Sequence, residues 1–416
     1  MKSRSASIAI GTMIAFAATA TGCSSAGAEG PTLEFQTGMS ADAKLMEALQ
    51  TAATEYEAEH EGVTIDLVPA GSSYESDMKV RLGAGDVPDV LWTHGWSLLR
   101  YSEFLAPLQD EPWAEHFNPV LTDAMMSDEG ELFAFPIDTD VAGLVYNADV
   151  LEQVGVDPET LTTWDAFTDA AVKVKDAGMT PIAAAGKDSG AGQVADWIAP
   201  GFYTDEQLDQ LTAGEFVDEP YEEMLGLVDD WREQGLFNPD YSSASEDDMA
   251  RSLSDGSTAF VFNPNIAVAN ALTYNPDATI GYMPVPTMTG DEPYLIGGEY
   301  NAYGIAKDSD NVELAKDFVS FLAEPDRAGA LASSVGSIPG LTNATSELGA
   351  LQPSYDRYVA DGTVPLKPYF DRVYLPNGMW NTLVVTTDSV VTGQSTPADA
   401  LAQVKSDYSG LVGQGE

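Results

Sequence analysis

The sequence predicts an α/β protein with two lobes, and two observations support this. The first is an alternation of strand-like and helix-like segments along the chain, which is typical of parallel or mixed sheets flanked by helices. The second is length, because roughly 386 of the 416 residues follow a short N-terminal segment, and this exceeds what one hydrophobic core usually organises.

The first elements have the order strand, helix, strand, helix, strand. Residues 33–36 (LEFQ) are a predicted strand, and Ser40 is the predicted N-cap of a helix whose apolar residues recur at helical spacing. Alternation over 63–67 predicts the next strand, a helix follows around 78–82, and residues 89–92 (DVLW) form the third strand. This order favours a parallel sheet.

The same alternation continues to the C-terminus. Further strands are predicted at 143–147, 180–185 and 258–263, and further helices from 162–167 onward, through 225–231, over 311–325 with Pro325 as its end, and after Thr396 as N-cap with Pro397 at the first helical position. No internal repeat or coiled-coil heptad is present.

The N-terminus has the pattern of a secretory signal. Lys2 and Arg4 precede an uncharged run over 6–20 that is rich in small residues. A membrane-spanning helix needs about 20 mostly apolar residues, so this run is too short to remain as a span. We expect residues 1–22 to be a signal peptide and the mature protein to work outside the cytoplasm.

Cys23 is the only cysteine and follows this signal directly. Three roles are open: a free thiol after ordinary cleavage, one half of an intermolecular disulfide, or a lipid attachment point. The third is favoured, because small residues precede Cys23 and residues 23–31 are typical of a flexible tether. The segment resembles a bacterial lipobox, although Ala20 stands where that motif usually has leucine. We expect lipid anchoring at the outer face of the membrane, or secretion if Cys23 is not acylated.

The chain is strongly acidic, with 66 Asp and Glu against 18 Lys and Arg and a formal net charge of -48. Acids occur along the whole sequence, as expected for a solvated surface. Nucleic acid, anionic lipid surfaces and phosphorylated ligands would be repelled, whereas neutral ligands would not. The charge therefore argues against these ligand classes but does not indicate which ligand is bound.

The motifs of common enzyme classes are absent. The three histidines have no metal-ligand spacing, and one cysteine cannot build a thiolate zinc site. Neither G-x-S-x-G nor the phosphate-binding G-x-x-x-x-G-K-[ST] occurs. The GAGQVA stretch at Gly190 fits a dinucleotide pattern, but no strand leads directly into it. We expect no cofactor, no metal and no catalytic residue.

Asp138 and Asp140 are the exception that keeps an enzymatic alternative open. On a strand, positions two apart face the same way, so both carboxylates can point into one cleft. Such a pair suits a glycosidase, and it equally suits acceptance of sugar hydroxyls. The spacing alone does not separate the two.

Several segments together resemble a known family. They are, in order, residues 85–110, 131–156, 304–340 and 379–401, and they extend over nearly the whole mature chain. They are similar to the extracellular solute-binding proteins of sugar ABC importers, the group that includes maltose-binding protein. The resemblance implies a two-lobed periplasmic-binding-protein-like fold of type II, with ligand held in a hinged cleft between the lobes.

The resemblance also implies lobe boundaries. We expect residues 32–138 with 300–338 in the first lobe, residues 139–299 with 339–416 in the second, and crossings near 137–141, 298–301 and 338–341.

Site residues are carried over position by position. Sugars need aromatic platforms for their C–H faces and polar partners for their hydroxyls. The resemblance implies Asp140 as a hydroxyl-binding carboxylate and Trp380 as a platform. The other implied ligand-facing residues are Thr93, His94, Trp96, Asp138, Trp197, Asn263, Glu299, Tyr300 and Asp371. Four tryptophans are expected to be packing residues instead: Trp92, Trp113, Trp164 and Trp231.

The resulting hypothesis is a monomeric receptor that captures a neutral oligosaccharide and delivers it to the transmembrane subunits of an ABC permease. The chain has no phosphate-binding loop and would supply recognition only. Two alternatives are a secreted glycoside-acting enzyme that uses Asp138 and Asp140, and a binder of polyamines or other cations on the same fold. Iron is less favoured among the cations, because no Tyr-Tyr pair occurs.

Overall fold

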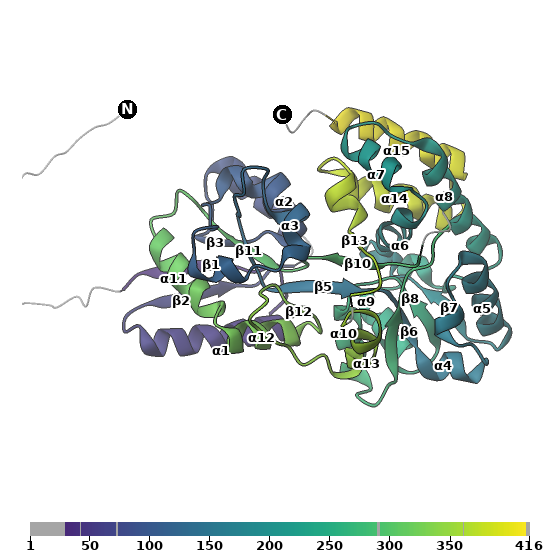
Figure 1. The fold of residues 1–416 in the computed structure, drawn as a ribbon, viewed down its shortest axis with the longest axis horizontal. Coiled ribbons are helices and arrows are strands. Elements are labelled where there is room, and N and C mark those ends of the chain that lie inside the picture. Colours follow the sequence, from purple (N-terminus) through teal and green to yellow (C-terminus); the bar gives the residue numbers. More distant parts are fainter. Residues whose placement is uncertain (1–29, 42, 72–73, 289–291, 361, 413–416) are drawn as a thin grey trace, which may run out of the picture.

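The computed structural model describes residues 30–41, 43–71, 74–288, 292–360 and 362–412. The predicted signal peptide and Cys23 lie outside the described residues. The described chain forms two α/β lobes that are joined by strands passing between them (Figure 1).

The first lobe is built on a five-stranded mixed sheet with the order β2-β1-β3-β11-β4. The central strand β1 pairs in parallel with β2 on one side and β3 on the other, whereas β11 runs antiparallel to both β3 and β4. The strands are β1 (Thr32–Gln36), β2 (Thr64–Val68), β3 (Val90–Trp92), β4 (Phe135–Pro136) and β11 (Ala302–Ile305). The helices are α1 (Lys44–Glu59), α2 (Tyr74–Ala84), α3 (Thr122–Met125), α11 (Val312–Leu322) and α12 (Pro325–Ser334).

The second lobe is built on a four-stranded mixed sheet with the order β7-β8-β6-β9. The strands are β6 (Leu144–Asn147), β7 (Thr180–Ala183), β8 (Thr258–Val261) and β9 (Ile280–Met283). The helices are α4 (Ala148–Gln153), α5 (Trp164–Asp176), α6 (Gly190–Ile198), α7 (Asp205–Thr212), α8 (Asp218–Glu233), α9 (Glu246–Ser254), α10 (Ile266–Tyr274), α13 (Gln352–Tyr358), α14 (Met379–Val391) and α15 (Pro397–Leu411).

A third sheet lies where the lobes meet, with the order β12-β5-β10-β13. It consists of β5 (Asp138–Ala142), β10 (Leu295–Gly298), β12 (Ile338–Pro339) and β13 (Leu366–Pro368). Figure 1 shows β5 and β10 running between the two lobes. Strand β5 pairs antiparallel with both β10 and β12, so this sheet ties together segments that are far apart in the sequence.

Each lobe has its own hydrophobic core. The chain passes from one core to the other at the connecting strands. The first core uses buried residues up to Ile137 and resumes at Ala302, ending with Leu341. The main second core begins at Ala142, runs to Ile296 and resumes at Tyr369. The chain therefore changes lobes along β5, between β10 and β11, and after β12.

Two predicted helix ends differ from the structure. Ser40 does not cap α1; the N-cap is Ala43, and the Ser40 side chain is exposed. Pro325 does not end α11, which stops at Leu322; instead it opens α12 at the first helical position. Proline suits the first turn of a helix because the N–H it lacks has no helical partner there.

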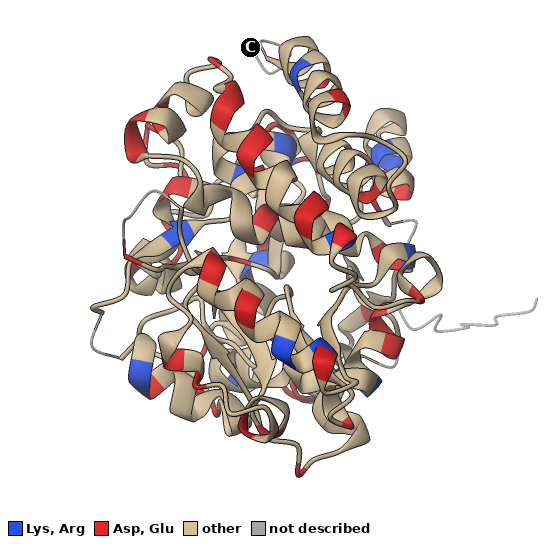
Figure 2. Cartoon of the chain, turned by 90° about the vertical axis from the view of Figure 1, so that its right-hand side faces the viewer, with Lys and Arg blue, Asp and Glu red and all other residues tan. Residues whose placement is uncertain are grey.

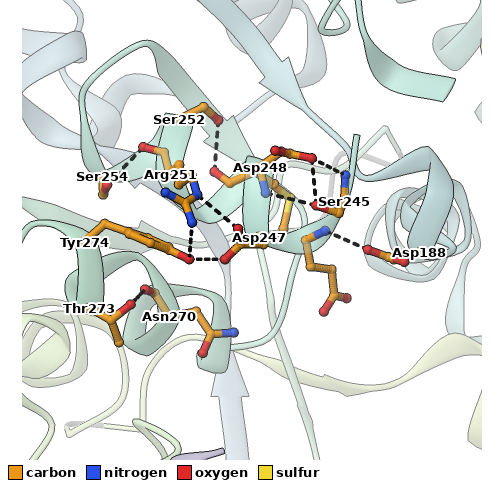
Figure 3. A network of polar contacts seen from close by, with 12 residues as sticks. Asp188, Ser245, Asp247, Asp248, Arg251, Ser252, Ser254, Asn270, Thr273 and Tyr274 are labelled. Atoms are coloured by element: carbon orange, nitrogen blue, oxygen red, sulfur yellow. Dashed lines mark hydrogen bonds and ion pairs between the residues drawn. The ribbon is translucent and has the colours of Figure 1, made fainter. Parts of the chain in front are cut away.

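Other helix ends follow the predicted capping chemistry. Thr163 and Thr396 accept hydrogen bonds from the backbone N–H groups of Ala166 and Asp399, at the starts of α5 and α15. The hydroxyl of Ser245 and the carboxylate of Asp248 cap α9 reciprocally (Figure 3). These bonds satisfy N–H groups that a helix leaves free at its first turn.

Acidic residues, red in Figure 2, occur on many helices and loops across this view of the molecule. This distribution fits a generally solvated surface. Within the described ranges, no helix combines the length and the apolar character that crossing a membrane requires.

Candidate ligand-binding site

A cavity of about 170 Å³ lies between the two lobes. The first lobe contributes Glu75, Trp92, His94 and Trp96 to its wall, the second contributes Gln193, Asp196, Pro264, Tyr369, Asp371, Arg372 and Trp380, and the connecting segment contributes Tyr300. Because both lobes supply the wall, a change in their relative position would change the cavity directly.

Three indole rings form the apolar part of the wall. Trp92 ends β3, Trp96 closes the short 3₁₀ turn that follows it, and Trp380 lies in the first turn of α14. The guanidinium of Arg100 lies 4.2 Å from the centre of the Trp96 ring. Arg100 does not line the cavity itself, and its cation–π contact helps to hold the Trp96 ring in place. Flat aromatic surfaces of this kind suit the C–H faces of a sugar ring.

His94 is locked in place by its neighbours. It has a positive φ of 38°, and its Nε2 lies 2.6 Å from Glu75 Oε1. Burial lowers the pKa of His94 to about 4, so the ring is neutral at pH 7, with Nε2 against the Glu75 carboxylate. Burial alone would raise the pKa of Glu75, but the hydrogen bonds from His94 and Arg100 bring it below its usual value. His94 is therefore a buried, neutral ring in the wall of the site.

Two acids, Asp196 on α6 and Asp371 in the π-helical turn Phe370–Tyr374, form a pair in the wall. The backbone N–H of Asp371 donates to Asp196 Oδ1 at 2.8 Å. Two neighbouring carboxylates repel each other when both are ionised, which favours a proton on one of them. Burial raises the pKa of both acids, which allows the pair to hold that proton.

Arg372 supplies the opposite charge. Its guanidinium donates to the backbone carbonyl of Glu299, lies 4.1 Å from the centre of the Tyr369 ring, and has Nε 3.8 Å from Asp371 Oδ1. Glu299 itself is fully buried, and burial raises the pKa of its carboxyl to about 8. A protonated Glu299 and one shared proton on the acid pair leave this end of the site close to neutral.

Asp138 and Asp140 stand behind the wall rather than on it. Asp140 accepts hydrogen bonds from the hydroxyls of Ser337 (2.9 Å) and Tyr369 (2.8 Å). Asp138 accepts from the backbone N–H of Tyr300 (3.1 Å) and from the backbone and side chain of Asn301 (2.8 and 3.2 Å). Both carboxylates are thus occupied by protein donors, and each supports a tyrosine that does line the cavity.

The sequence-predicted residues divide into three groups. Trp380, Trp96, His94, Tyr300 and Asp371 line the cavity. Asp138, Asp140, Thr93, Asn263 and Glu299 are buried beside it or behind it. Trp197 lies in the second core: its indole is fully buried and its N–H donates to the Gly143 carbonyl at 2.9 Å, so the structure does not place it toward a ligand.

The tryptophans expected to pack behave differently from one another. Trp113, Trp164 and Trp231 are buried in the cores. Trp92, expected to pack in the core because it alternates with Val90 on a strand, packs against two hydrophobic clusters of the first lobe and also lines the cavity. Strand alternation places Trp92 on one face of the sheet, and the strand ends at this residue, where the face meets the cleft.

Sequence reasoning missed six wall residues: Glu75, Gln193, Asp196, Pro264, Tyr369 and Arg372. Three of these lie next to predicted residues in the sequence. Tyr369 and Arg372 are within two positions of the predicted Asp371, and Asp196 directly precedes the predicted Trp197. On α6, however, neighbouring positions point about 100° apart. Choosing Trp197 in place of Asp196 therefore selected the core face of the helix instead of its cleft face.

No group of three metal-binding side chains occurs among the residues that the structure describes. The polar groups in the cavity wall are three carboxyls, one guanidinium, one amide, one imidazole and two phenol hydroxyls, together with the indole rings. This set can hydrogen-bond a polyhydroxylated neutral molecule and pack against its apolar faces.

Two α/β lobes, joined by crossing strands and enclosing a mixed aromatic and polar cavity, define the class of two-lobed solute-binding proteins. The chain belongs to the bacterial extracellular solute-binding protein family, whose model matches residues 42–328.

Individual relatives agree with this assignment. The chain is 31% identical over 402 residues to the melibiose/raffinose/stachyose-binding protein MelE of Bacillus subtilis (strain 168), covering 94% of this chain and 93% of the relative. A sugar transporter of Bacillus licheniformis, solved in complex with stachyose, is 30% identical with a TM-score of 0.82 and covers 92% of this chain and 100% of that one. An open conformation of the putative binding protein MsmE from Bacillus subtilis is 29% identical with a TM-score of 0.81, covering 93% and 98% of the two chains.

Proposed function

We propose that this protein is the extracellular receptor of a sugar ABC importer and that its ligand is a neutral oligosaccharide of the melibiose, raffinose and stachyose type. The observation that carries the proposal is the cavity itself, whose wall combines three indoles with three acids and one guanidinium. The relatives named for melibiose, raffinose and stachyose support the choice of sugar.

The wall chemistry favours a neutral ligand over an anionic one. Of the charged groups that line the cavity, Glu75, Asp196 and Asp371 are acids and Arg372 is the single guanidinium. A phosphorylated ligand would meet these carboxyls, whereas a sugar hydroxyl can accept from the guanidinium and donate to a carboxylate. This matters because a more distant relative, at 24% identity, is named as an sn-glycerol-3-phosphate-binding protein.

Binding is favoured over catalysis at the two acids that raised the enzymatic alternative. Asp138 and Asp140 already accept hydrogen bonds from Asn301, Tyr300, Ser337 and Tyr369. A general acid or nucleophile must reach the substrate. We therefore propose that the captured sugar leaves the protein chemically unchanged.

Two further features belong to the same proposal. The crossing segments β5, β10 to β11, and β12 would act as the hinge about which the lobes close on the sugar. Cys23 would carry the lipid that keeps the receptor near its permease, with residues 23–31 as the tether.

A binding screen tests this function. Purified protein is titrated calorimetrically with melibiose, raffinose, stachyose, maltotriose, spermidine and glycerol 3-phosphate. We expect at least one of the first three sugars to bind most tightly and to be recovered intact. Preferential binding of glycerol 3-phosphate or spermidine, or hydrolysis that Asp140→Asn abolishes, would contradict the proposal.

A further inference from the structure

Two neighbouring helices of the second lobe each carry part of the cavity wall. Helix α6 supplies Gln193 and Asp196, and α14 supplies Trp380. The separation of α6 and α14 therefore controls how far the Trp380 indole stands from the Asp196 carboxyl.

The two helices are in close contact at Gly192. A Cβ built on this residue would lie 2.6 Å from Val384 Cγ2 and 3.0 and 3.2 Å from Cη2 and Cζ2 of the Trp380 ring. Val384 follows Trp380 by four residues on α14, and Asp196 follows Gly192 by four on α6. Residues four apart share a helix face. Gly192 and Asp196 therefore lie on one face of α6, and Trp380 and Val384 lie on one face of α14.

The backbone gives no reason for glycine at this position. Gly192 lies within α6 and is not among the glycines with positive φ. Glycine inside a helix lowers stability relative to alanine, because it loses more conformational freedom on folding. The close approach of α14 is the physical feature that requires the missing Cβ.

We propose that Gly192 is a positioning residue for the ligand: the absence of its Cβ lets the Trp380 indole lie against α6, and this sets the space between Trp380 and the Asp196–Asp371 pair in which a pyranose ring rests. The nature of the ligand rests on the proposed function above. The contact between the helices does not depend on it.

A matched pair of glycine substitutions tests the proposal. Gly192→Ala places a methyl group in the contact, whereas Gly226→Ala on α8 places one where nothing lies within 4 Å. We expect Gly192→Ala to bind the best wild-type sugar roughly tenfold more weakly, because the displaced indole no longer meets the ring. Gly226→Ala should bind like wild type and melt at the same temperature or higher.

Two readouts separate positioning from general destabilisation. Gly192→Ala should also reduce the ligand-induced change in tryptophan emission, since Trp380 moves. The double variant Gly192→Ala/Val384→Ala removes the nearest clashing methyl and should recover part of the affinity. If Gly192→Ala does not fold, the double variant is compared with Val384→Ala alone, and weaker binding by the double variant is expected because the Trp380 contact persists.

The possible results are distinguishable. Wild-type affinity in Gly192→Ala, or in the double variant relative to Val384→Ala alone, would overturn the inference. A lower melting temperature of Gly192→Ala with unchanged affinity would do the same. If wild type binds none of the sugars tested, the proposed function has failed, whereas tight wild-type binding with no effect at position 192 defeats only the positioning role.

Discussion

Trp380 is the residue at which the aromatic part of the site can be tested alone. It lines the cavity from the first turn of α14 and packs on Gly192. Trp380→Ala should cost about 2 kcal/mol or more of binding, on the order of thirtyfold in affinity, because the sugar loses its flat partner. Calorimetric titration with the best wild-type sugar measures this, and unchanged affinity would remove Trp380 from the site. Trp164→Phe in the second core is the control that leaves the cavity intact.

Glu299 makes stability depend on pH. Burial raises its pKa to about 8, while Asp138 is raised to about 7 by burial and by the nearby charge of Asp140. An acid whose pKa is raised in the folded state stabilises the fold fully below its unfolded pKa, and this stabilisation is lost as pH rises through the folded pKa. His94 acts in the opposite sense between about pH 4 and 6.5, because its pKa is lowered.

We therefore expect the melting temperature to fall between about pH 6.5 and 8, where His94 no longer contributes. Glu299→Gln should reduce this decline, whereas Glu313→Gln, at an exposed position on α11, should leave it unchanged. Calorimetric melting of the three proteins across this range measures the effect. A slope that is identical in wild type and Glu299→Gln would show that Glu299 does not hold a proton in the folded protein.

Of the residues predicted from sequence to face the ligand, those whose type and segment were both distinctive lie in the cavity wall, and their contact with a sugar stays a prediction. Trp380, Trp96 and Asp371 line the cavity. In segments beside the cleft, bulky or charged side chains are accommodated more easily at the cleft than within the packed interior. The sequence did not distinguish two neighbours that point about 100° apart on one helix, as with Asp196 and Trp197. The role of Asp140 as a support for Tyr369 depends on a partner 229 residues away, which no local pattern reveals.

At the scale of elements, helix capping gives a prediction with a built-in control. The Thr163 hydroxyl accepts from Ala166 N–H at the start of α5, whereas the Ser40 side chain caps nothing at α1. Thr163→Ala should lower the free energy of unfolding by about 1 kcal/mol, and Ser40→Ala should change it by less than about 0.5 kcal/mol. Urea unfolding of both variants measures the difference. Equal losses would contradict the assignment of the caps.

Strands and helices were predictable wherever the periodicity was strong. The segments around β1, β3, β6, β7 and β8 were expected within a few residues of their observed bounds. Pro325 was misjudged because proline both stops one helix and starts the next, and only the following packing of α12 decides between these roles. The antiparallel course of β11 beside β3 depends on the chain returning from the second lobe, which local alternation cannot predict.

At the scale of the whole molecule, direct contacts join the lobes around the cavity. Arg100 in the first lobe donates to Asn377 Oδ1 at 3.2 Å, just before α14 of the second. Gly95 lies so close to Arg372 that a Cβ there would stand 2.1 Å from Arg372 Cδ. The two lobes therefore touch each other beside the cavity, and we propose that they separate to admit the sugar.

The central claim is that a neutral oligosaccharide binds between the lobes, with one ring on Trp380 and its hydroxyls on Asp196, Asp371 and Arg372. A crystal structure of the protein grown with saturating stachyose tests this most directly. We predict a sugar ring stacked on the Trp380 indole, with hydroxyl oxygens within hydrogen-bond distance of the acid pair. Stachyose bound elsewhere on the surface, or a cavity without sugar at a saturating concentration, would contradict it.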